Sequence, residues 1–340
     1  MKLWWAKYRG DEADRDMTQS ARANALGYVG SSVRLFRELQ KLGVEFTPEA
    51  KTWIWYCHPK VYLRDGQERG ERNILLTMYE GTPVPPEFPE AFSIVDGILT
   101  PSRFCRDLFK PFAKGKPIGL TGLGFDRDVF TFERRNLNPE GPFKFLFCGA
   151  PNGRKGFPQV LLAWKWCGFM RSNVFQLTMK TTTEVEEEQV ELKNVRFDSS
   201  YLSVDELADL YRSHHCLVAP THGEGWGLIP MEALATGMPV ISTKYSGVLD
   251  FLSEGNAWFT PHTFQFVNQK LDDGRELPFR AAVADHAGLG RTMIEVVKKY
   301  DIALKKAQRG SVEVHNRFGW EAVAKRFLDT VRGMEARWAS

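Results

Sequence analysis

The sequence is poor in cysteine and lacks long hydrophobic runs. Its 340 residues contain five cysteines, which are odd in number, far apart and without a Cys-x-x-Cys pair. This pattern excludes a closed disulfide framework and a cysteine-ligated zinc site, and it predicts free thiols in a reducing compartment. No segment approaches the roughly 18 consecutive apolar residues that a membrane span needs, and Met1–Ala6 is followed at once by charged residues. We therefore expect a cytoplasmic protein, either free or peripheral to the inner face of a membrane.

The sequence also lacks a large net charge. Lys and Arg number 45 and Asp and Glu number 42, which leaves a formal charge of +3. That balance excludes a surface that binds polyanions everywhere, although it allows a local basic face. One basic segment, residues 103–116, interleaves Lys and Arg with phenylalanines. It fits a helix with a buried apolar face and a solvated charged face, and it also fits contact with DNA phosphates or anionic lipid.

Short apolar runs alternate with helical periodicity along the whole chain, which is typical of parallel α/β folds. The length exceeds the roughly 250–300 residues at which a single core stops growing, so we expect two domains. Prolines at 81–89 predict a rigid loop without helix, and the segment 136–142 predicts a linker. The first helix is expected at residues 30–42, and strands are expected at residues 2–6, 52–57, 73–78, 94–100, 143–148, 216–219 and 240–243.

The clearest local signals lie in the second half. Ser203 and Glu206 form a capping box at the start of a helix. A strand at 216–219 then leads into the glycine-rich loop 220–227, and a second helix follows. This order places the loop at the carboxyl edge of a parallel sheet, where open α/β folds bind their ligands.

Two glutamates, Glu224 and Glu232, flank the start of that second helix. Gly225 and Gly227 allow backbone N–H groups to approach a ligand closely, and a helix N-terminus favours an anion or a polyhydroxyl group. Two helical turns carry Glu232 about 11 Å along the axis, roughly the reach from a sugar to the ribose of a nucleotide. On spacing alone, a capped helix with two exposed glutamates is an equal alternative.

The segment from Pro220 to Ile241 resembles the signature of the retaining glycosyltransferases of family four, because two glutamates, three glycines and a Gly-x-Pro-Val-Ile exit stand in the same register. Other similar segments, in the family's order, are Gly27–Gly30 with Arg34, Tyr79–Thr82, Thr100–Phe104, Gly122–Asp126 and Phe318–Glu321. The resemblance implies an α/β protein of the GT-B fold, with two Rossmann-like parallel-sheet domains facing each other across a cleft. Residues 1–140 would bind the acceptor, residues 141–317 would bind the nucleotide sugar, and a helix in 318–340 would cross back to the N-terminal domain.

The resemblance also implies a diphosphate-gripping loop in the second domain. The loop Gly149–Gly156 is similar to that of the family, and Lys155 stands in the register of the family lysine. Its ammonium can neutralise diphosphate charge. Ala150 replaces the usual arginine of the family, and the neighbouring Arg154 is the substitute that we expect.

By the same resemblance, Glu224 would meet the hydroxyls of the donor sugar and Glu232 would bind both ribose hydroxyls. The remaining donor contacts are expected from His222, Gly225, Trp226, Gly227 and Leu228. The catalytic set comprises Glu224, Lys155 and His58, although a structural role for His58 is an alternative. The implied acceptor and cleft residues are Gly27, Tyr28, Gly30, Glu80, Gly124 and Asp126.

The implied reaction is a front-face retaining transfer in which the donor diphosphate leaves and its own oxygen takes the acceptor proton. Positioning and stabilisation of the leaving group then carry most of the catalysis. We expect no bound cofactor and no metal, because no Asp-x-Asp pair stands in a plausible binding loop. The donor is a nucleotide-diphosphate sugar whose base the sequence does not specify.

The acceptor is a glycan, a lipid-linked sugar or a small molecule on this interpretation. One alternative is transfer to a hydroxymethylated base in DNA, which a steep loss of binding with salt would indicate. The other alternative is a non-catalytic relative that binds nucleotides or glycans. Ala150 is the feature that favours it, while both glutamates and Lys155 favour an enzyme.

Overall fold

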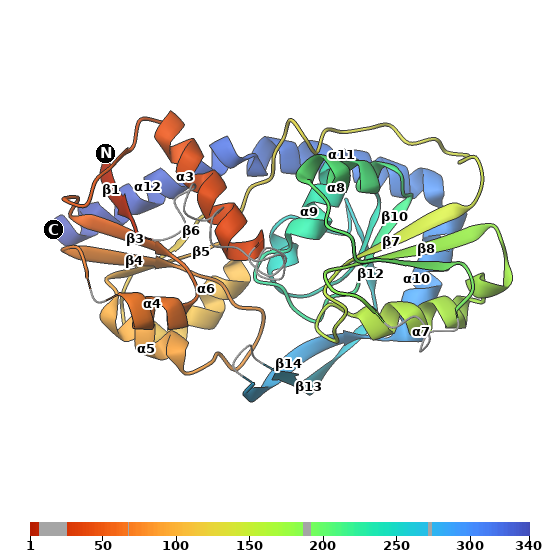
Figure 1. Ribbon diagram of the computed structural model, residues 1–340, viewed down its shortest axis with the longest axis horizontal. Helices are drawn as coiled ribbons and strands as arrows, with labels where there is room; N and C mark the ends of the chain where they lie inside the picture. The colour runs from red at the N-terminus through yellow and green to blue at the C-terminus, as the bar shows by residue number, and fades with distance from the viewer. Residues whose placement is uncertain (7–25, 67, 186–191, 271–273) are drawn as a thin grey trace. The chain divides into compact units, whose positions relative to one another are not determined.

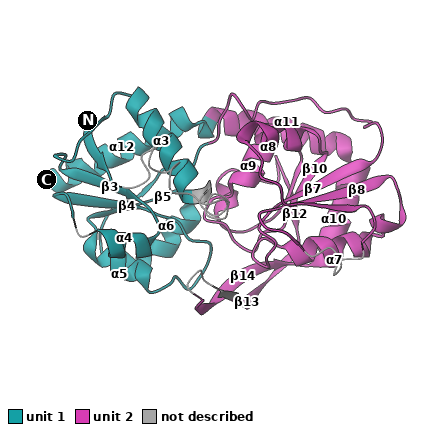
Figure 2. Cartoon of the chain, viewed as in Figure 1, with its two compact units in different colours: residues 1–124, 317–340 teal, residues 125–316 magenta. Residues whose placement is uncertain are grey.

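The structure is a computed structural model that describes residues 1–6, 26–66, 68–185, 192–270 and 274–340. The chain divides into two compact units (Figure 2): unit 1 comprises residues 1–124 and 317–340, and unit 2 comprises residues 125–316. Each unit contains a six-stranded sheet in which all paired strands are parallel, so the predicted pair of α/β sheets is confirmed. The charged residues directly after Ala6 lie outside the described residues. No helix in the described part of the chain is both long and apolar enough to cross a membrane.

The sheet of unit 1 has the strand order β2-β1-β3-β4-β5-β6 (Figure 1). Its strands are β1 (Lys2–Trp5), β2 (Glu45–Phe46), β3 (Thr52–Tyr56), β4 (Arg72–Leu76), β5 (Gly97–Thr100) and β6 (Ile118–Leu120). β4 and β5 are buried along almost their whole length. Strands covered on both faces carry continuous apolar runs instead of a polar alternation, which is why these segments are visible in the sequence.

In the described part of unit 1 the helices are the π-helical turn η1 (Leu26–Gly30), α3 (Ser31–Lys41), α4 (Pro59–Asp65), α5 (Glu87–Ile94), α6 (Arg103–Phe109), η2 (Lys110–Phe112) and α12 (Trp320–Ala339). α12 is the last element of the chain, yet it packs on α3 and β6. The Phe327 ring lies 5.8 Å from the Trp5 ring, and the Arg326 guanidinium donates to the Thr121 carbonyl oxygen at 2.7 Å. The C-terminal helix therefore completes the core of unit 1.

The sheet of unit 2 has the strand order β12-β11-β10-β7-β8-β9. Its strands are β7 (Phe143–Gly149), β8 (Phe175–Thr181), β9 (Val195–Asp198), β10 (Cys216–Ala219), β11 (Val240–Thr243) and β12 (Trp258–Thr260). Among the described residues of unit 2, the helices are α7 (Phe157–Cys167), η3 (Phe169–Arg171), α8 (Val204–Arg212), α9 (Leu228–Ala235), η5 (Ser246–Asp250), α10 (His286–Lys298) and α11 (Tyr300–Phe318). The predicted capping box at Ser203 and Glu206 is present at the start of α8.

An antiparallel hairpin in unit 2 was not predicted from the sequence. It consists of β13 (His262–Lys270) and β14 (Glu276–Ala284), which pair along their whole length. The Ala282 N–H at its base donates to the His222 carbonyl oxygen at 3.0 Å. The alternation of Phe264 and Phe266 with polar residues was the available signal, because period-two patterns indicate strands.

The proline-rich segment 81–89 differs from the expectation at its end. Residues 81–86 are non-helical, but α5 already begins at Glu87 and includes Pro89 in its first turn. A proline is tolerated there because the first N–H groups of a helix have no acceptor within the helix. The prediction of a loop is therefore wrong for residues 87–89.

Unit 2 begins at Phe125, ahead of the linker expected at 136–142. The Phe130 ring lies 5.9 Å from the Tyr211 ring, and the Glu133 N–H donates to the Thr236 carbonyl oxygen at 3.1 Å. The segment 125–136, which we name the strap, is thus attached to unit 2 by side-chain packing and by hydrogen bonds.

Candidate functional site

Three loops of unit 2 meet at the carboxyl edge of its sheet. They follow the adjacent strands β7, β10 and β11. Gly156, in the loop after β7, has φ +73°, and a Cβ atom there would lie 2.3 Å from the Pro220 carbonyl oxygen. The His222 N–H donates to the Arg154 carbonyl oxygen at 2.7 Å. The first two loops are therefore held together by their backbones, at a distance that only a glycine allows.

Glu224 lies where these loops converge. Lys155 Nζ donates to Glu224 Oε1 at 2.6 Å, and the Thr221 hydroxyl donates to the same oxygen at 3.0 Å. Arg154 Nη1 lies 3.6 Å from Glu224 Oε2. The side chains of Glu224, Lys155 and Arg154 are only 13%, 19% and 21% exposed. Two cations and one carboxylate in a partly buried cluster give it a net positive charge, which suits an anionic ligand.

The Glu224 carboxyl is ionised at neutral pH. Burial alone would raise its pKa, but the neighbouring Lys155 and Arg154 cations outweigh burial and the pKa lies below its ordinary value of 4.5. An ionised carboxylate accepts hydrogen bonds and has no proton to give. Glu224 can therefore bind hydroxyl groups, whereas it cannot act as a general acid in this state.

The backbone around Glu224 is fixed by the third loop. Its N–H donates to Ser246 Oγ at 2.8 Å, and the Gly247 N–H donates to the Glu224 carbonyl oxygen at 2.9 Å. Gly227 has φ +104° and precedes α9 without a side-chain cap. The Trp226 side chain is buried. A ligand at this turn would accordingly meet the backbone and the α9 N-terminus, while the indole belongs to the core.

Glu232 lies on α9, half-buried, and accepts a hydrogen bond from the Tyr211 hydroxyl to its Oε2 at 3.3 Å. The Cys148 thiol at the end of β7 is close to it. Burial and the Glu232 charge raise the pKa of Cys148 to about 12, against the opposing effects of Lys180 and Lys155. Glu232 and Lys155 therefore both lie near the carboxyl end of β7, as the sequence motif requires.

His222 is 3% exposed, and neither ring nitrogen has a hydrogen-bond partner among the residues that the structure describes. Burial, followed by the Arg154 charge, lowers its pKa to about 4, so the imidazole is neutral at pH 7. A buried imidazole without partners costs free energy. Its position within the loop 220–227 is set by backbone bonds to Arg154 and Ala282.

In unit 1 the structure brings Tyr28 and Glu80 together. The Tyr28 hydroxyl donates to the Met78 carbonyl oxygen at 2.8 Å and accepts from the Met78 N–H at 3.0 Å. Burial raises the pKa of Tyr28 well above 10, and the Glu80 charge adds to this. Gly27 and Gly30 belong to the same turn, η1, as Tyr28. These residues connect η1 to the segment that follows β4.

His58 and Gly124 have identifiable roles in the fold. His58 caps α4, because its Nδ1 accepts from the Lys60 N–H at 3.3 Å, and its ring packs 5.2 Å from the Phe88 ring. A Cβ atom at Gly124 would lie 2.5 Å from Trp320 Cδ2. Both residues therefore contribute to stability, whatever else they do.

Asp126 lies in unit 2, where its carbonyl oxygen accepts from the N–H groups of Val129 and Phe130. Asp126 and Asp128 do form an Asp-x-Asp triplet in this turn, so the sequence argument that no binding loop contains one is wrong. The residues that the structure describes contain no group of three or more His, Cys, Asp or Glu side chains placed to hold a metal ion.

Sequence reasoning missed the side chains that hold the site residues in place. Ser246 reaches Glu224 from the loop after β11, and Tyr211 reaches Glu232 from the end of α8. Thr221 stands inside the motif, so its hydroxyl was a detectable candidate. The contacts of Ser246 and Tyr211 depend on tertiary structure, and no local pattern signals them.

The comparisons with known proteins agree with this geometry. Residues 128–273 match the family model described as glycosyl transferases group 1. The D-inositol 3-phosphate glycosyltransferase of Corynebacterium urealyticum is 26% identical over 196 residues, which are 58% of this chain and 36% of that protein. The mannosylfructose-phosphate synthase of Agrobacterium fabrum is 26% identical over 149 residues, 42% of this chain and 28% of that protein. The chain thus spans only about a third of these curated relatives.

Solved structures show the same fold at low sequence identity. The sucrose-phosphate synthase from Thermosynechococcus elongatus matches with a TM-score of 0.64 and 15% identity, over 84% of this chain and 73% of that chain. Anabaena HepE in complex with UDP and glucose matches with a TM-score of 0.66 and 11% identity, over 97% of this chain and 99% of that chain. Residues 128–273 of this chain are thus similar to the group 1 glycosyltransferases, and its two Rossmann-like parallel sheets give it the GT-B fold.

Proposed function

We propose that this chain is a retaining glycosyltransferase that moves a sugar from a nucleotide-diphosphate sugar to an acceptor hydroxyl. The observation that carries the proposal is the cluster of Lys155, Arg154 and Glu224, in which Lys155 Nζ lies 2.6 Å from Glu224 Oε1. It combines cations for a diphosphate with an ionised carboxylate for sugar hydroxyls. The cluster stands at the carboxyl edge of a parallel sheet, the usual place for a ligand in such folds.

In this proposal the donor lies along the loops after β7 and β10. Lys155 and Arg154 bind the diphosphate, and Arg154 takes the place of the family arginine that is Ala150 here. Glu224 accepts hydrogen bonds from the sugar hydroxyls, and Glu232 accepts them from the ribose. The backbone N–H groups of Gly225, Trp226, Gly227 and Leu228 contribute through the N-terminus of α9.

The proposed reaction proceeds on one face of the sugar. The acceptor oxygen bonds to the anomeric carbon while the bond from that carbon to the diphosphate oxygen breaks. The same phosphate oxygen takes the acceptor proton, so no strong general base is needed. Lys155 and Arg154 stabilise the charge that develops on the leaving diphosphate. His58 and Tyr28 are proposed to serve the acceptor side.

We propose that the reaction needs no metal, because two side-chain cations already face the diphosphate position. An assay with excess chelator tests this point directly. We expect activity to be retained, and a loss that Mg²⁺ or Mn²⁺ restores would contradict it. We also propose that the protein works in the cytoplasm on a glycan, a lipid-linked sugar or a small acceptor.

Titration calorimetry with UDP-glucose, GDP-mannose and ADP-glucose would identify the donor. HepE was solved with UDP-glucose, so that donor is the first to test. A donor at 100 times its Kd also raises the free energy of unfolding by about 2.7 kcal/mol, which a thermal shift detects. Lys155→Met should weaken donor binding, while Lys165→Met, an exposed residue on α7 of the same unit, should not. Equal binding by both variants would remove the diphosphate assignment.

A further inference from the structure

Tyr211 is buried at the end of α8, and its hydroxyl is directed to the carboxylate that we assign to the ribose. It donates to Glu232 Oε2 at 3.3 Å. Burial and the neighbouring Cys148 and Glu232 raise the pKa of Tyr211 well above 10, so the hydroxyl keeps its proton over the whole physiological range. A carboxylate held by a fixed neutral donor has fewer orientations open to it. Tyr211 is thus able to set the direction in which the other Glu232 oxygen is presented.

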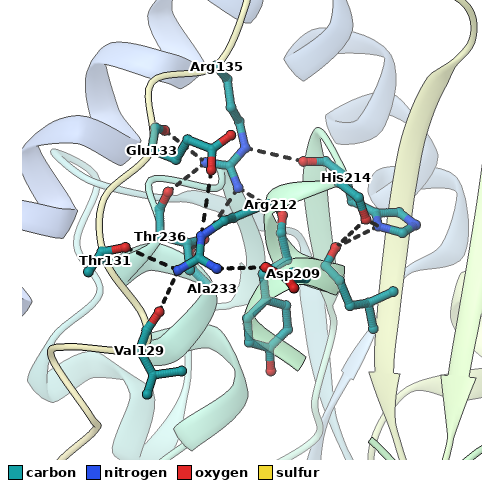
Figure 3. A network of polar contacts seen from close by, with 12 residues as sticks. Val129, Thr131, Glu133, Arg135, Asp209, Arg212, His214, Ala233 and Thr236 are labelled. Atoms are coloured by element: carbon teal, nitrogen blue, oxygen red, sulfur yellow. Dashed lines mark hydrogen bonds and ion pairs between the residues drawn. The ribbon is translucent and has the colours of Figure 1, made fainter. Parts of the chain in front are cut away.

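The main chain of Tyr211 is held by Arg135 from the strap, whose guanidinium also reaches Thr236 and His214 (Figure 3). Arg135 Nη2 donates to the Tyr211 carbonyl oxygen at 2.8 Å, and Arg135 Nη1 donates to the Thr236 carbonyl oxygen at 2.7 Å. Arg135 Nε donates to the His214 carbonyl oxygen at 3.2 Å. These oxygens lie at or just after the C-terminal ends of α8 and α9, where carbonyl groups have no partner within the helix. One guanidinium therefore connects the ends of the two helices that carry Tyr211 and Glu232.

The connection is charge-assisted. Burial lowers the pKa of Arg135 to about 10, which leaves the group charged at neutral pH. The guanidinium is half-buried and bonds both helix ends, so moving either end would break charge-assisted hydrogen bonds and cost free energy. Arg212, next to Tyr211 in sequence, donates to the Val129 carbonyl oxygen and to Thr131 Oγ1 of the strap. The helix ends are consequently fixed by two arginine contacts with one segment.

We propose that Tyr211 is a positioning residue for ribose recognition, and that Arg135 keeps it in register with Glu232. The proposal rests on the proposed function, since it takes Glu232 as the ribose ligand. Tyr211 itself does not touch the nucleotide. It aims the Glu232 carboxylate, so its effect should appear only with ligands that carry both ribose hydroxyls.

The test compares Tyr211→Phe with the native protein in calorimetric binding of UDP and of 2′-deoxy-UDP. We expect the Kd for UDP to rise about five- to tenfold, as for the loss of one hydrogen bond to a charged group, with less than about a twofold change for 2′-deoxy-UDP. Tyr300→Phe is the matched control, because the buried Tyr300 also donates through its hydroxyl, to the His215 carbonyl oxygen at 3.4 Å. It should bind both ligands as the native protein does.

Glu232→Gln distinguishes the ribose assignment of Glu232 from the positioning role of Tyr211. If Glu232→Gln weakens UDP binding while Tyr211→Phe leaves it unchanged, the ribose assignment stands and the role of Tyr211 is overturned. If Glu232→Gln has no effect on UDP binding either, the ribose assignment itself fails. An equal loss for UDP and 2′-deoxy-UDP in Tyr211→Phe would also overturn the proposal, because it would indicate a general structural effect. Arg135→Lys should reproduce the selective loss, and equal losses for the two ligands there would contradict the role of Arg135.

Discussion

Unit 2 and unit 1 share an architecture, yet their motif residues behave differently. In unit 2 the side chains of Lys155, Arg154 and Glu224 pair with one another at the edge of the sheet. In unit 1 the equivalent motif residues act on the fold, because His58 caps a helix and Gly124 makes room for Trp320. A charged ligand is bound by charged side chains, and such residues in a motif can be recognised directly in a sequence. In unit 1 the motif residues His58 and Gly124 instead have visible roles in helix capping and packing.

The largest effect should come from Glu224→Gln, which keeps the shape of the side chain and removes its charge. We expect kcat/KM to fall about 10²- to 10³-fold, the range seen when one preorganised polar contact of an active site is lost. Glu295→Gln is the control, since its exposed ion pair with Lys299 belongs to α10 and its C-terminal end, outside the three loops of the site. A change of less than about threefold in steady-state kinetics would show that the converging charges of unit 2 are structural.

The next largest effect should be a difference in stability between the two units at acidic pH. His214, His215 and His222, all in unit 2, have pKa values lowered from 6.5 to about 4, mainly by burial. The unfolded chain therefore binds more protons than the folded one between these values, and stability falls as the pH drops from about 6.5 to about 4. Hydrogen exchange followed by mass spectrometry should show unit 2 losing protection first. Simultaneous loss in both units would contradict this expectation.

Gly124→Ala should lower the free energy of unfolding and leave the affinity for the donor unchanged. Its new Cβ would lie 2.5 Å from Trp320 Cδ2, and overpacking of this kind costs about 1–3 kcal/mol. Gly333→Ala, in α12 of the same unit, where the same addition meets nothing within 4 Å, is the control. Chemical denaturation measures the difference. Donor affinity in calorimetry should be unchanged, and a weakened donor would mean that Gly124 serves the site as well as the core.

The smallest effect should come from His58. Loss of its cap in His58→Ala should lower the free energy of unfolding by about 1 kcal/mol, and His58→Asn should restore most of it, because asparagine is a good N-cap. The activity of the two variants distinguishes a role of His58 in helix capping from a role in the reaction. If Asn restores stability and activity together, His58 acts through the helix. If Asn restores stability alone, the imidazole contributes to the reaction. Unit 1 would then, like unit 2, contribute a motif side chain to the chemistry.

The sequence predicted both sheets because buried parallel strands such as β4 and β7 are continuous apolar runs with clear ends. It also found Lys155 and Glu224, which the structure brings to 2.6 Å. The sequence did not predict the hairpin β13–β14, because its alternating apolar residues lie among exposed polar residues. The contacts of Ser246 and Arg135 could not be predicted from a local pattern, since they join segments that are distant in sequence and adjacent only in the folded unit.

The strap has a practical consequence for anyone who divides this chain into modules. A fragment or hybrid enzyme joined at Pro142, where the sequence has its most obvious linker, would remove Arg135 and leave the carbonyl oxygens of Tyr211 and Thr236 without their shared donor. The natural cut lies between Gly124 and Phe125. A hybrid in which unit 2 is exchanged between relatives would have to include the strap, because the strap is part of unit 2.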